Sequence, residues 1–412
     1  MVRRLLVLGA GAAGTMAANK LRRKLDEDWI VTVVDADDEH HYQPGYLLLP
    51  FGEYEPADLV KSRRSLLDPA VDLVYGEIDL VEPDKSSVKL TDGRSLDYDQ
   101  LIIATGTHPR PEETPGLDSD EAGVSIHSFY TLEGSVALRD ALADWEGGRL
   151  VINIVDMPIK CPVAPLEFTF LAHAFFEDRG LADKVDITYV TPLPGAFTKP
   201  VASKFLGDML DVRGISVESD FYIEEVDSEG HRLVSYDERE VPYDLLVTIP
   251  LNMGAAYIGR SGLGDELDHV PVDKHTFLSR DHDNIFAIGD AANLPTSKAG
   301  SVAHFSVDVL TENFVDHING RPMRHHFDGH SNCFIESGHG KASLIDFNYD
   351  TEPLPGKYPL PGVGPLTLLG ETEMNHWGKL LFRSIYWNVL MPGRPLFVPA
   401  DMSMLGKIPQ EA

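Results

Sequence analysis

Short apolar runs separated by longer amphipathic segments dominate the pattern of the chain. Residues 5–8 form the first apolar run, a glycine-rich turn follows, and a helical pattern continues to about residue 25. A second apolar run at residues 30–34 ends at Asp35. Strand, turn, helix and strand in this order are typical of a βαβ unit whose parallel strands are buried.

The same alternation returns after residue 115 and predicts a second α/β unit. We expect helices at 132–145 and 165–179 and strands at 150–155 and 185–190. Between the two units, residues 71–101 carry turn residues at positions 83–84 and 92–93 and are interpreted as a β-meander.

The first glycine-rich turn has the spacing of a dinucleotide-binding fingerprint. Gly9 allows a tight turn, Gly11 lets the backbone approach a pyrophosphate, and Gly14 permits close packing of the helix. Asp35 follows 21 residues after the last of these glycines, where a carboxylate binds the ribose. The turn is therefore predicted to bind a dinucleotide.

Two later segments favour FAD over NAD as that dinucleotide. Ala104-Thr105-Gly106 ends an apolar strand and looks like the ATG motif of flavoprotein relatives of the disulfide reductases. The apolar strand 284–288 ends at Gly289-Asp290 and precedes a helix-like stretch, where the Asp of such relatives holds the ribityl chain and a helix start faces the pyrophosphate. Three motifs in this order predict bound FAD.

The second α/β unit lacks the corresponding fingerprint. After strand 150–155 the chain runs through 156–165, which is bulky and interrupted by proline where a pyrophosphate needs bare backbone. Thr191-Pro192 stands where a ribose-binding acid is expected. A nicotinamide site is therefore not expected there, and Cys161 occupies the segment instead.

Length and charge limit the remaining possibilities. A chain of 412 residues is long enough for two or three domains. The net charge of −30 argues against nucleic-acid binding and resembles proteins of salt-in halophiles, with an acidic protein of an ordinary cytoplasm as the alternative. Because the first strand starts at Arg3 and no apolar run reaches the roughly 18 residues of a membrane span, we expect an intracellular catalytic body.

The two cysteines, Cys161 and Cys333, lie 172 positions apart, which excludes a CxxC loop and a disulfide-rich secreted scaffold. Cys161 precedes the helix that begins near Pro165, and a helix N-terminus favours the thiolate. For either cysteine the alternative is a small buried apolar residue. A metal site of Cys333 with His325, His326 and His330 is a weaker alternative, and those histidines are expected on the surface.

Five segments resemble the sulfide:quinone oxidoreductases, and the resemblance covers essentially the whole chain. They are Lys160-Cys161-Pro162 to Glu167, Thr296 to Gly300, Cys333 to Lys341 with Asp346 to Tyr349, and His376 to Tyr386. The resemblance implies a disulfide or polysulfide bridge between the two cysteines beside the flavin. It also implies attack by hydrosulfide, with electrons passing through FAD to a membrane quinone and zero-valent sulfur or polysulfide as product.

The expected site residues follow from the motifs and the resemblance together. The catalytic residues are Cys161, Cys333 and, as base, Glu167, whose alternative is an exposed helical Glu. The expected quinone contacts are Phe334, Phe347 and Tyr386. The expected FAD contacts are Gly9, Gly11, Gly14, Asp35, Ala36, Pro44, Ile78, Ala104, Thr105, Gly106, Gly289, Asp290, Lys298, Gly300 and Lys341.

One position departs from many bacterial members of the family. They carry a third cysteine, which can hold the flavin covalently, in a segment resembling residues 124–128. This chain has His127 there, so FAD is expected to be non-covalent.

The last 36 residues differ in charge from the rest of the chain. Residues 377–412 carry a net charge of +2, which leaves −32 for the remainder. Apolar residues recur at helical spacing between Trp377 and Val389, and Phe397 adds another aromatic. Such a helix can lie in a bilayer interface, and packing on the core is the alternative. We expect monotopic attachment to the cytoplasmic face of the membrane, so that deletion of 377–412 releases the protein while sulfide still bleaches the flavin.

The expected fold class is α/β, with two Rossmann-like dinucleotide-binding domains and a C-terminal amphipathic helical membrane-attachment region. Residues 1–115 and 270–330 form the FAD-binding domain, 116–269 the second domain, and 331–412 the C-terminal region. The alternative functions are the flavoprotein subunit of a flavocytochrome c sulfide dehydrogenase, a type II NADH:quinone dehydrogenase, and a non-enzymatic flavin-binding sensor. A homo-oligomer is left open.

Overall fold

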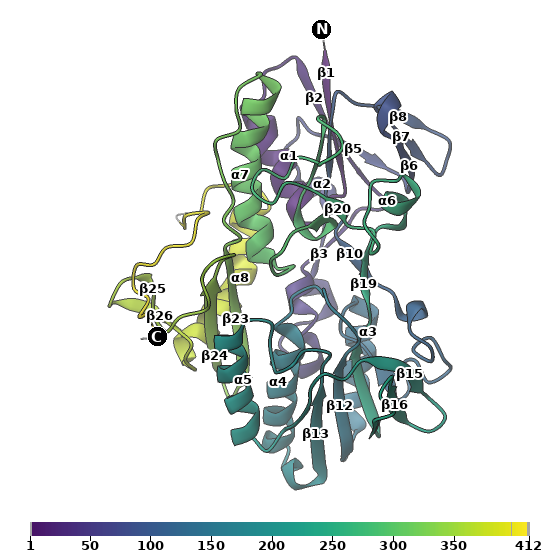
Figure 1. Ribbon diagram of the computed structural model, residues 1–412, viewed down its shortest axis with the longest axis vertical. Coiled ribbons are helices and arrows are strands. Elements are labelled where there is room, and N and C mark those ends of the chain that lie inside the picture. The colour runs from purple at the N-terminus through teal and green to yellow at the C-terminus, as the bar shows by residue number, and fades with distance from the viewer. Residues whose placement is uncertain (1, 397, 410–412) are drawn as a thin grey trace.

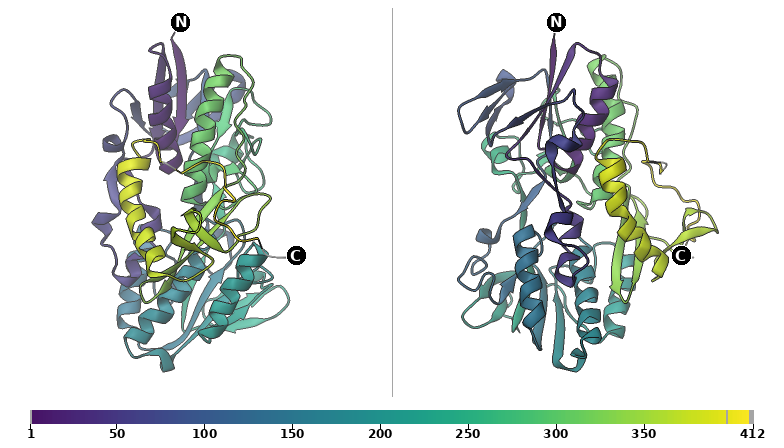
Figure 2. Two further views of the ribbon diagram at one scale, coloured as in Figure 1. Left: turned by 90° about the vertical axis from the view of Figure 1, so that its left-hand side faces the viewer. Right: turned by 180° about the vertical axis from the view of Figure 1, so that it is seen from behind.

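Figure 1 shows the computed structural model, which describes residues 2–396 and 398–409, as an elongated molecule with an α/β unit at each end. The N-terminal strands and the helices α1 (Ala12–Lys24) and α7 (Gly300–Ile318) lie in the upper half, and α3 (Leu132–Asp144), α4 (Ala164–Asp178) and α5 (Pro200–Val212) lie in the lower half. The C-terminal elements run along one side between the two halves, where α8 (Glu373–Ile385) stands out in yellow in Figure 2. Phe397 and Glu411, which contribute to the predicted tail, lie outside the described residues.

The first unit is built on a five-stranded parallel sheet. Its strands, in the order β21-β9-β1-β2-β5, are β21 (Ile285–Ala287), β9 (Gln100–Ile103), β1 (Arg3–Leu8), β2 (Trp29–Asp35) and β5 (Asp72–Tyr75). Leu5 and Val7 are fully buried, as expected of a strand covered on both faces. The helices α1 (Ala12–Lys24) and α7 (Gly300–Ile318) pack against each other beside this sheet. The predicted βαβ opening is confirmed.

Two predictions in this unit need correction. The meander is shorter than residues 71–101, because β5 and β9 belong to the parallel sheet and only β6 (Ile78–Glu82), β7 (Ser87–Leu90) and β8 (Ser95–Asp97) form the antiparallel ribbon. The helix-like stretch after Asp290 is a single 3-10 turn, Gly289–Ala291, and α7 begins only at Gly300. Pro295 lies in the intervening segment, and Lys298 forms an isolated bridge with Lys160.

The second unit has a parallel sheet of the same size. Its strand order is β11 (Ile126–His127), β18 (Leu245–Ile249), β12 (Gly148–Ile154), β13 (Val185–Val190) and β14 (Ser216–Glu218). The helices α3 (Leu132–Asp144), α4 (Ala164–Asp178) and α5 (Pro200–Val212) flank it, and β15 (Ile223–Asp227), β16 (Arg232–Ser235) and β17 (Glu240–Pro242) form a small antiparallel sheet. The predicted helices and strands of this unit are confirmed to within two residues.

The C-terminal elements form a four-stranded sheet and one helix. The order is β23 (Ser331–Gly338), β24 (Lys341–Phe347), β26 (Gly364–Leu368) and β25 (Gly356–Leu360). α4 packs on β23, while α8 (Glu373–Ile385) packs on β24 and continues into a π-helical turn at Tyr386–Leu390. Within residues 2–396 and 398–409, no helix is both long and apolar enough to cross a membrane.

Candidate functional site

A cavity of about 580 Å³ lies at the carboxyl ends of the first sheet and reaches α4 and α8. Parallel α/β sheets bind ligands at this edge. The predicted FAD contacts that line it are Gly9, Gly11, Asp35, Ala36, Pro44, Ile78, Ala104, Thr105, Gly106, Gly289, Asp290, Lys298 and Gly300. Cys161, Glu167 and Tyr386 line the same cavity. One space therefore joins the glycine-rich turn to one of the two cysteines.

The three glycines of the fingerprint have different surroundings. Gly9 has a φ of +95°, which a residue with a side chain rarely adopts. A Cβ on Gly14 would lie 1.9 Å from the Gly9 carbonyl oxygen, so Gly14 packs the helix against the turn and does not line the cavity. A Cβ on Gly11 would meet nothing within 4 Å, and the space above it opens into the cavity.

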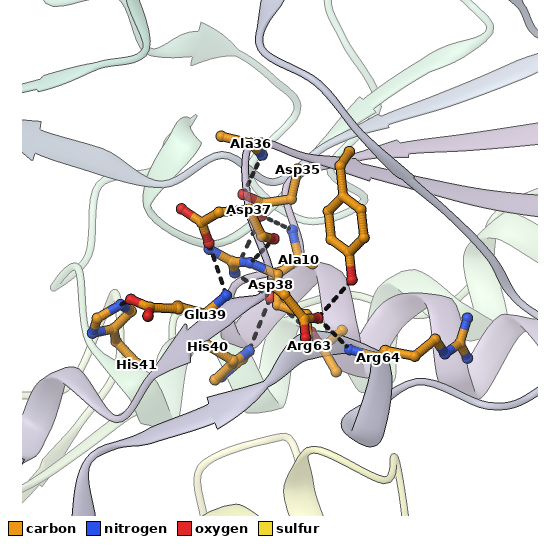
Figure 3. Close-up of polar contacts among 12 residues, drawn as sticks. Ala10, Asp35, Ala36, Asp37, Asp38, Glu39, His40, His41, Arg63 and Arg64 are labelled. Carbon is orange, nitrogen blue, oxygen red and sulfur yellow. Dashed lines mark hydrogen bonds and ion pairs between the residues drawn. The ribbon is translucent and has the colours of Figure 1, made fainter. Parts of the chain in front are cut away.

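Asp35 holds the glycine-rich turn as well as facing the cavity (Figure 3). Its Oδ2 accepts from the Ala10 N–H at 2.6 Å and its Oδ1 from the Ala36 N–H at 2.8 Å. Arg63 Nη1 lies 3.2 Å from Oδ2 and also donates to the Ala10 carbonyl at 3.0 Å. Burial raises the pKa of the carboxyl, and the Arg63 charge opposes that rise. Arg63 was not among the residues predicted from the sequence.

His40 links the same turn to the C-terminal region. Its Nδ1 lies 2.9 Å from the Ala10 carbonyl and its Nε2 lies 2.7 Å from the Tyr386 hydroxyl. Burial lowers the pKa of His40 to about 3, so the ring is neutral. A carbonyl only accepts, so Nδ1 carries the proton and the Tyr386 hydroxyl donates to Nε2. The hydroxyl of Tyr386 is thereby committed to His40, and its ring remains available to the cavity.

Lys160 and Lys298 line the part of the cavity next to Cys161, which we call the sulfur side. Lys298 Nζ donates to the Asp290 carbonyl at 2.7 Å and to the Ala292 carbonyl at 3.2 Å. Burial lowers the pKa of Lys298 and that of Lys160 to about 8 each, with the Asp290 charge opposing in both cases. Burial raises the pKa of the Asp290 carboxyl, and the two lysines oppose the rise. Lys160 also lines the cavity and was missed as a contact.

The residues that line the cavity fit FAD. Bare backbone at Gly11 suits a pyrophosphate, Asp35 suits a ribose, and Asp290 with Lys298 suits a polar chain beside them. Lys341, in contrast, lies exposed at the start of β24 and does not line the cavity. The structure gives no support to an FAD contact for Lys341.

Cys161 lies before α4 with a φ of +48°. Its N–H donates to the Lys298 carbonyl at 2.6 Å, and its own carbonyl accepts from Ala164 N–H at 2.8 Å. Burial, and then the nearby Glu167 carboxylate, raise the pKa of the thiol, while Lys379 opposes this. The Ala164 N–H at the helix start lowers the pKa of the thiol as predicted, but desolvation outweighs it and the net shift is upward.

Cys333 lies on β23 with 8% of its surface exposed. Burial raises the pKa of its thiol to about 11, with Ser331 and Lys379 opposing the rise. Both cysteines are free thiols. The charge of Cys333 nevertheless contributes to the pKa of Cys161, so the two lie within electrostatic range of each other.

Glu167 is a fully buried residue of α4, so the alternative of an exposed helical Glu is excluded. Lys379 Nζ donates to its Oε1 at 2.7 Å, and the Glu336 N–H donates to the same oxygen at 2.9 Å. Its Oε2 is buried without a hydrogen-bond partner among the described residues. Burial raises the pKa of this carboxyl, and Lys379 opposes the rise. From the sequence, Lys379 was expected only as part of the His376 to Tyr386 segment and as one of the positive charges of residues 377–412, not as a partner of Glu167.

The three predicted quinone contacts are not brought together. Tyr386 lines the cavity, where Phe382 joins it. Phe334 lies under α8, with its ring 2.9 Å from the position of a Cβ on Gly378. Phe347 is buried beside Lys199, whose Nζ lies 5.5 Å from the ring centroid. Neither Phe334 nor Phe347 lines this cavity.

The histidines near Cys333 separate into two groups. His325 and His326 are exposed, as expected. His330 is buried, which corrects the expectation of a surface position: its Nε2 lies 2.7 Å from Asp346, and its ring stacks on Phe305 at 4.1 Å. No group of three or more potential metal ligands occurs among residues 2–396 and 398–409. His127 is buried on β11, where its Nε2 lies 3.1 Å from the Val124 carbonyl.

Comparisons with known proteins agree with this geometry. Residues 3–152 match the family described as pyridine nucleotide-disulphide oxidoreductase. The mitochondrial sulfide:quinone oxidoreductase of Dictyostelium discoideum is 25% identical over 401 residues, which cover 95% of this chain and 87% of that relative. The enzyme of the same name from Mus musculus is 28% identical over 356 residues, covering 85% and 79%.

A solved structure shares the fold. The sulfide:quinone oxidoreductase from the hyperthermophilic bacterium Aquifex aeolicus superposes with a TM-score of 0.80 at 18% identity, covering 95% of this chain and 92% of that one. The family match and these relatives together support the class of FAD-dependent oxidoreductases. Within that class, the resemblance to the sulfide:quinone oxidoreductase family indicated by the cysteine segments is confirmed.

Proposed function

We propose that the protein oxidises hydrosulfide to zero-valent sulfur or polysulfide through Cys161, Cys333 and non-covalent FAD, and passes the electrons to a membrane quinone. The observation that carries the proposal is that Cys161 and Glu167 line the same cavity as the dinucleotide-binding turn. The named function of the relatives from Dictyostelium and mouse supports it.

The sulfur step is thiol–disulfide exchange. In the oxidised protein a bond joins the two cysteine sulfurs, which lie within electrostatic range of each other. Hydrosulfide attacks one sulfur, the S–S bond breaks, and a persulfide and a thiolate remain. FAD, when bound, supplies the two-electron acceptor for this sulfur centre and the donor for the quinone.

The buried charges around Cys161 suit this step. The Lys379 ammonium attracts the hydrosulfide anion and stabilises the thiolate that the exchange releases, as its lowering effect on both cysteine pKa values indicates. Glu167, with one oxygen bound to Lys379 and the other unpaired, is the proposed base for the proton of the persulfide. We assign the ring of Tyr386 to the quinone side of the cavity.

The surface around α8 supports attachment to a membrane. Trp377 and Leu381 are 62% and 58% exposed on α8, and Met374 is 49% exposed. Leu360 and Val363, at the β25–β26 hairpin, are 57% and 75% exposed, and β26 packs against α8. We call these five residues the tail patch. An exposed apolar patch of this kind marks a contact with a membrane or a partner.

The reaction is tested with purified protein, sulfide and decyl-ubiquinone, and then with NADH in place of sulfide. We expect quinone reduction with sulfide and none with NADH, since the second unit lacks a pyrophosphate-binding turn. Quinone reduction by NADH but not by sulfide would contradict the proposal and favour a type II NADH:quinone dehydrogenase. Sulfide oxidation with transfer to a haem protein but never to quinone would favour the flavocytochrome alternative.

Membrane attachment needs a test other than deletion of 377–412. That deletion removes Lys379, the partner of buried Glu167, and Tyr386, which lines the cavity, so the sulfide reaction is not expected to survive it. Substituting Trp377→Asp and Leu381→Asp together leaves the cavity intact. The double variant should lose binding to anionic vesicles, whereas Tyr236→Asp, at a position 72% exposed in the second unit, should not.

A further inference from the structure

Four ionisable side chains lead from the surface to the sulfur side of the cavity. The exposed side-chain fractions are 17% for His376 and 2% for Glu336, then 12% for Lys379 and 0% for Glu167. α8 carries His376 and Lys379, β23 carries Glu336 and α4 carries Glu167. The proposed sulfur step uses Lys379 and Glu167, and it leaves the other two without a role.

Direct contacts join an outer pair, His376 with Glu336, and an inner pair, Lys379 with Glu167, and the main-chain N–H of Glu336 links the pairs by donating to Glu167 Oε1 at 2.9 Å. His376 Nδ1 lies 3.0 Å from Glu336 Oε2 and 3.1 Å from Oε1. The Lys379 ammonium, bound to Glu167, lies within electrostatic range of Glu336, because each contributes to the pKa of the other. Burial raises the pKa of the Glu336 carboxyl, and His376 and Lys379 oppose the rise. The inner pair ends at the unpaired Oε2 of Glu167, a residue that lines the cavity.

The proposed reaction requires a proton from outside the cavity. Its balance is HS⁻ + H⁺ + quinone → S⁰ + quinol: sulfur loses two electrons, and the quinone gains them together with two protons. The hydrosulfide supplies one of these two protons, and solvent supplies the second. A buried site needs side chains that relay this proton, because a carboxylate or ammonium sealed from water exchanges protons only through its neighbours.

We propose that His376 and Glu336 form the entrance of a proton route that continues through Lys379 to Glu167, which first passes on the persulfide proton and then the proton from solvent, both across the shared cavity to the quinone. His376 collects the proton at its solvent side, and Glu336 takes it from Nδ1. The flexible stem of Lys379 lets its ammonium move between the two carboxylates. This inference rests on the proposed function, since only quinone reduction creates the demand for the second proton.

The groups facing Glu336 come from three directions. They are His376 and Lys379 from α8, Glu167 from α4, and Tyr54 from the loop after the 3-10 turn Leu49–Phe51. The Lys379 and Arg383 charges both act on Tyr54, whose pKa burial raises. The proton route itself consists of the carboxylates Glu336 and Glu167 and the basic groups His376 and Lys379. Substituting His376 leaves the contact between Lys379 and Glu167 unchanged.

The test compares His376→Asn with a matched control, His339→Asn. His339 also pairs with a glutamate, Glu177, at 2.8 Å, but on the surface at the β23–β24 turn, where 49% of its side chain is exposed. Asn and His have similar helix propensities, so α8 should form in the variant. Glu336→Gln is the second variant, since it keeps the main-chain N–H that binds Glu167.

We expect His376→Asn and Glu336→Gln each to lower kcat for sulfide-dependent quinone reduction by roughly tenfold, with the KM for sulfide little changed. The loss should grow as pH rises, because protons become scarcer, and the solvent deuterium isotope effect should increase. Added imidazole should restore turnover in His376→Asn but not in Glu336→Gln, because the His376 side chain is 17% exposed whereas that of Glu336 is only 2% exposed. The flavin absorption spectrum checks that each variant has folded.

Wild-type kcat, pH profile and isotope effect in both variants would overturn the route. So would a loss in His376→Asn that imidazole does not restore and that His339→Asn shares. These outcomes are distinct from failure of the proposed function, which shows as absence of sulfide-dependent quinone reduction in the wild-type protein and removes the basis of the route with it.

Discussion

The turn after β1 and the loop after β12 occupy the same place in two parallel sheets of equal size, yet they are built for different chemistry. The first spans only residues 9–11 before α1 begins, and its backbone opens into the cavity at Gly11. The second spans residues 155–163 before α4, and it presents Cys161. One place in the fold thus holds the predicted cofactor-binding turn in one unit and the proposed sulfur nucleophile in the other.

The difference shows what each task requires of the chain. A pyrophosphate needs uncovered N–H groups at a helix start, so side chains are absent there. A sulfur centre needs a side chain held at a fixed point, and the Cys161 main chain is fixed on both sides by Lys298 and Ala164. Because the second loop contacts Lys298 of the first unit, the cysteine is positioned by both units.

The largest effect is expected from removing sulfur. Cys161→Ser and Cys333→Ser should each keep FAD but reduce sulfide-dependent quinone reduction by at least ~10²-fold, since both sulfurs act as one unit. Steady-state turnover and the flavin absorption spectrum measure the two properties separately. Near-normal turnover in either variant would refute the two-sulfur mechanism. The loop after β12 would then have no sulfur chemistry to set against the glycine-rich turn after β1.

A single methyl group added to the glycine-rich turn is expected to weaken FAD binding. Gly11→Ala places a Cβ where the protein has open space, so the fold should be kept, whereas FAD should bind roughly tenfold to a hundredfold more weakly because overpacking costs about 1–3 kcal/mol. Gly207→Ala in α5, also without a neighbour within 4 Å, is the control. Equal flavin content of both purified variants would contradict the assignment of Gly11 to the pyrophosphate.

The two carboxylates of the cavity should differ in their effect on cofactor retention. Asp290→Ala should lose more FAD than Asp35→Ala, because Asp290 faces the cavity between two buried lysines whereas Asp35 also binds the turn through Ala10 and Ala36. Fluorescence of released flavin after dilution measures the loss. Full occupancy in both variants would overturn the placement of the cofactor.

The smallest effect is expected from an ion pair at the amino ends of β12 and β18 in the second sheet. Asp244 accepts from Arg149, the hydrogen bonds lower its pKa to about 2, and the two side chains are 44% and 45% exposed. Its folded pKa lies below the usual value, so the stabilisation is present above about pH 4 and is lost as pH falls towards 2. Asp244→Asn should cost no more than about 1 kcal/mol at pH 7, because solvent screens the pair. Thermal unfolding at pH 7 and pH 3 measures this, and an equal cost at both values would contradict it.

Local patterns predicted most of the fold, because apolar periodicity and glycine spacing report directly on buried strands and tight turns. They could not predict that the segment after Asp290 stays non-helical, since its course depends on the bridge between Lys298 and Lys160, which is 138 positions away. The division into domains at 115, 270 and 330 stays a prediction.

The candidate site shows the same limit. Motifs found the cavity residues that use backbone or small side chains, whereas Arg63, His40 and Lys379 were missed because each acts through a partner distant in sequence. The elevated thiol pKa of Cys161 was missed for a related reason. Burial depends on what covers a residue, and the sequence around Cys161 shows only its own helix.

The hydrogen bond between His40 and Tyr386 couples the position of the glycine-rich turn to that of the C-terminal helix. Asn19 adds a second tie, since its side chain donates to the Met391 carbonyl at 2.7 Å. A ligand that displaces the Tyr386 ring would therefore pull on the loop that holds the flavin nucleotide. Flavin fluorescence could then serve as an optical signal for quinone-site inhibitors, and Tyr386→Phe, which keeps the ring and removes the tie, would silence that signal without closing the cavity.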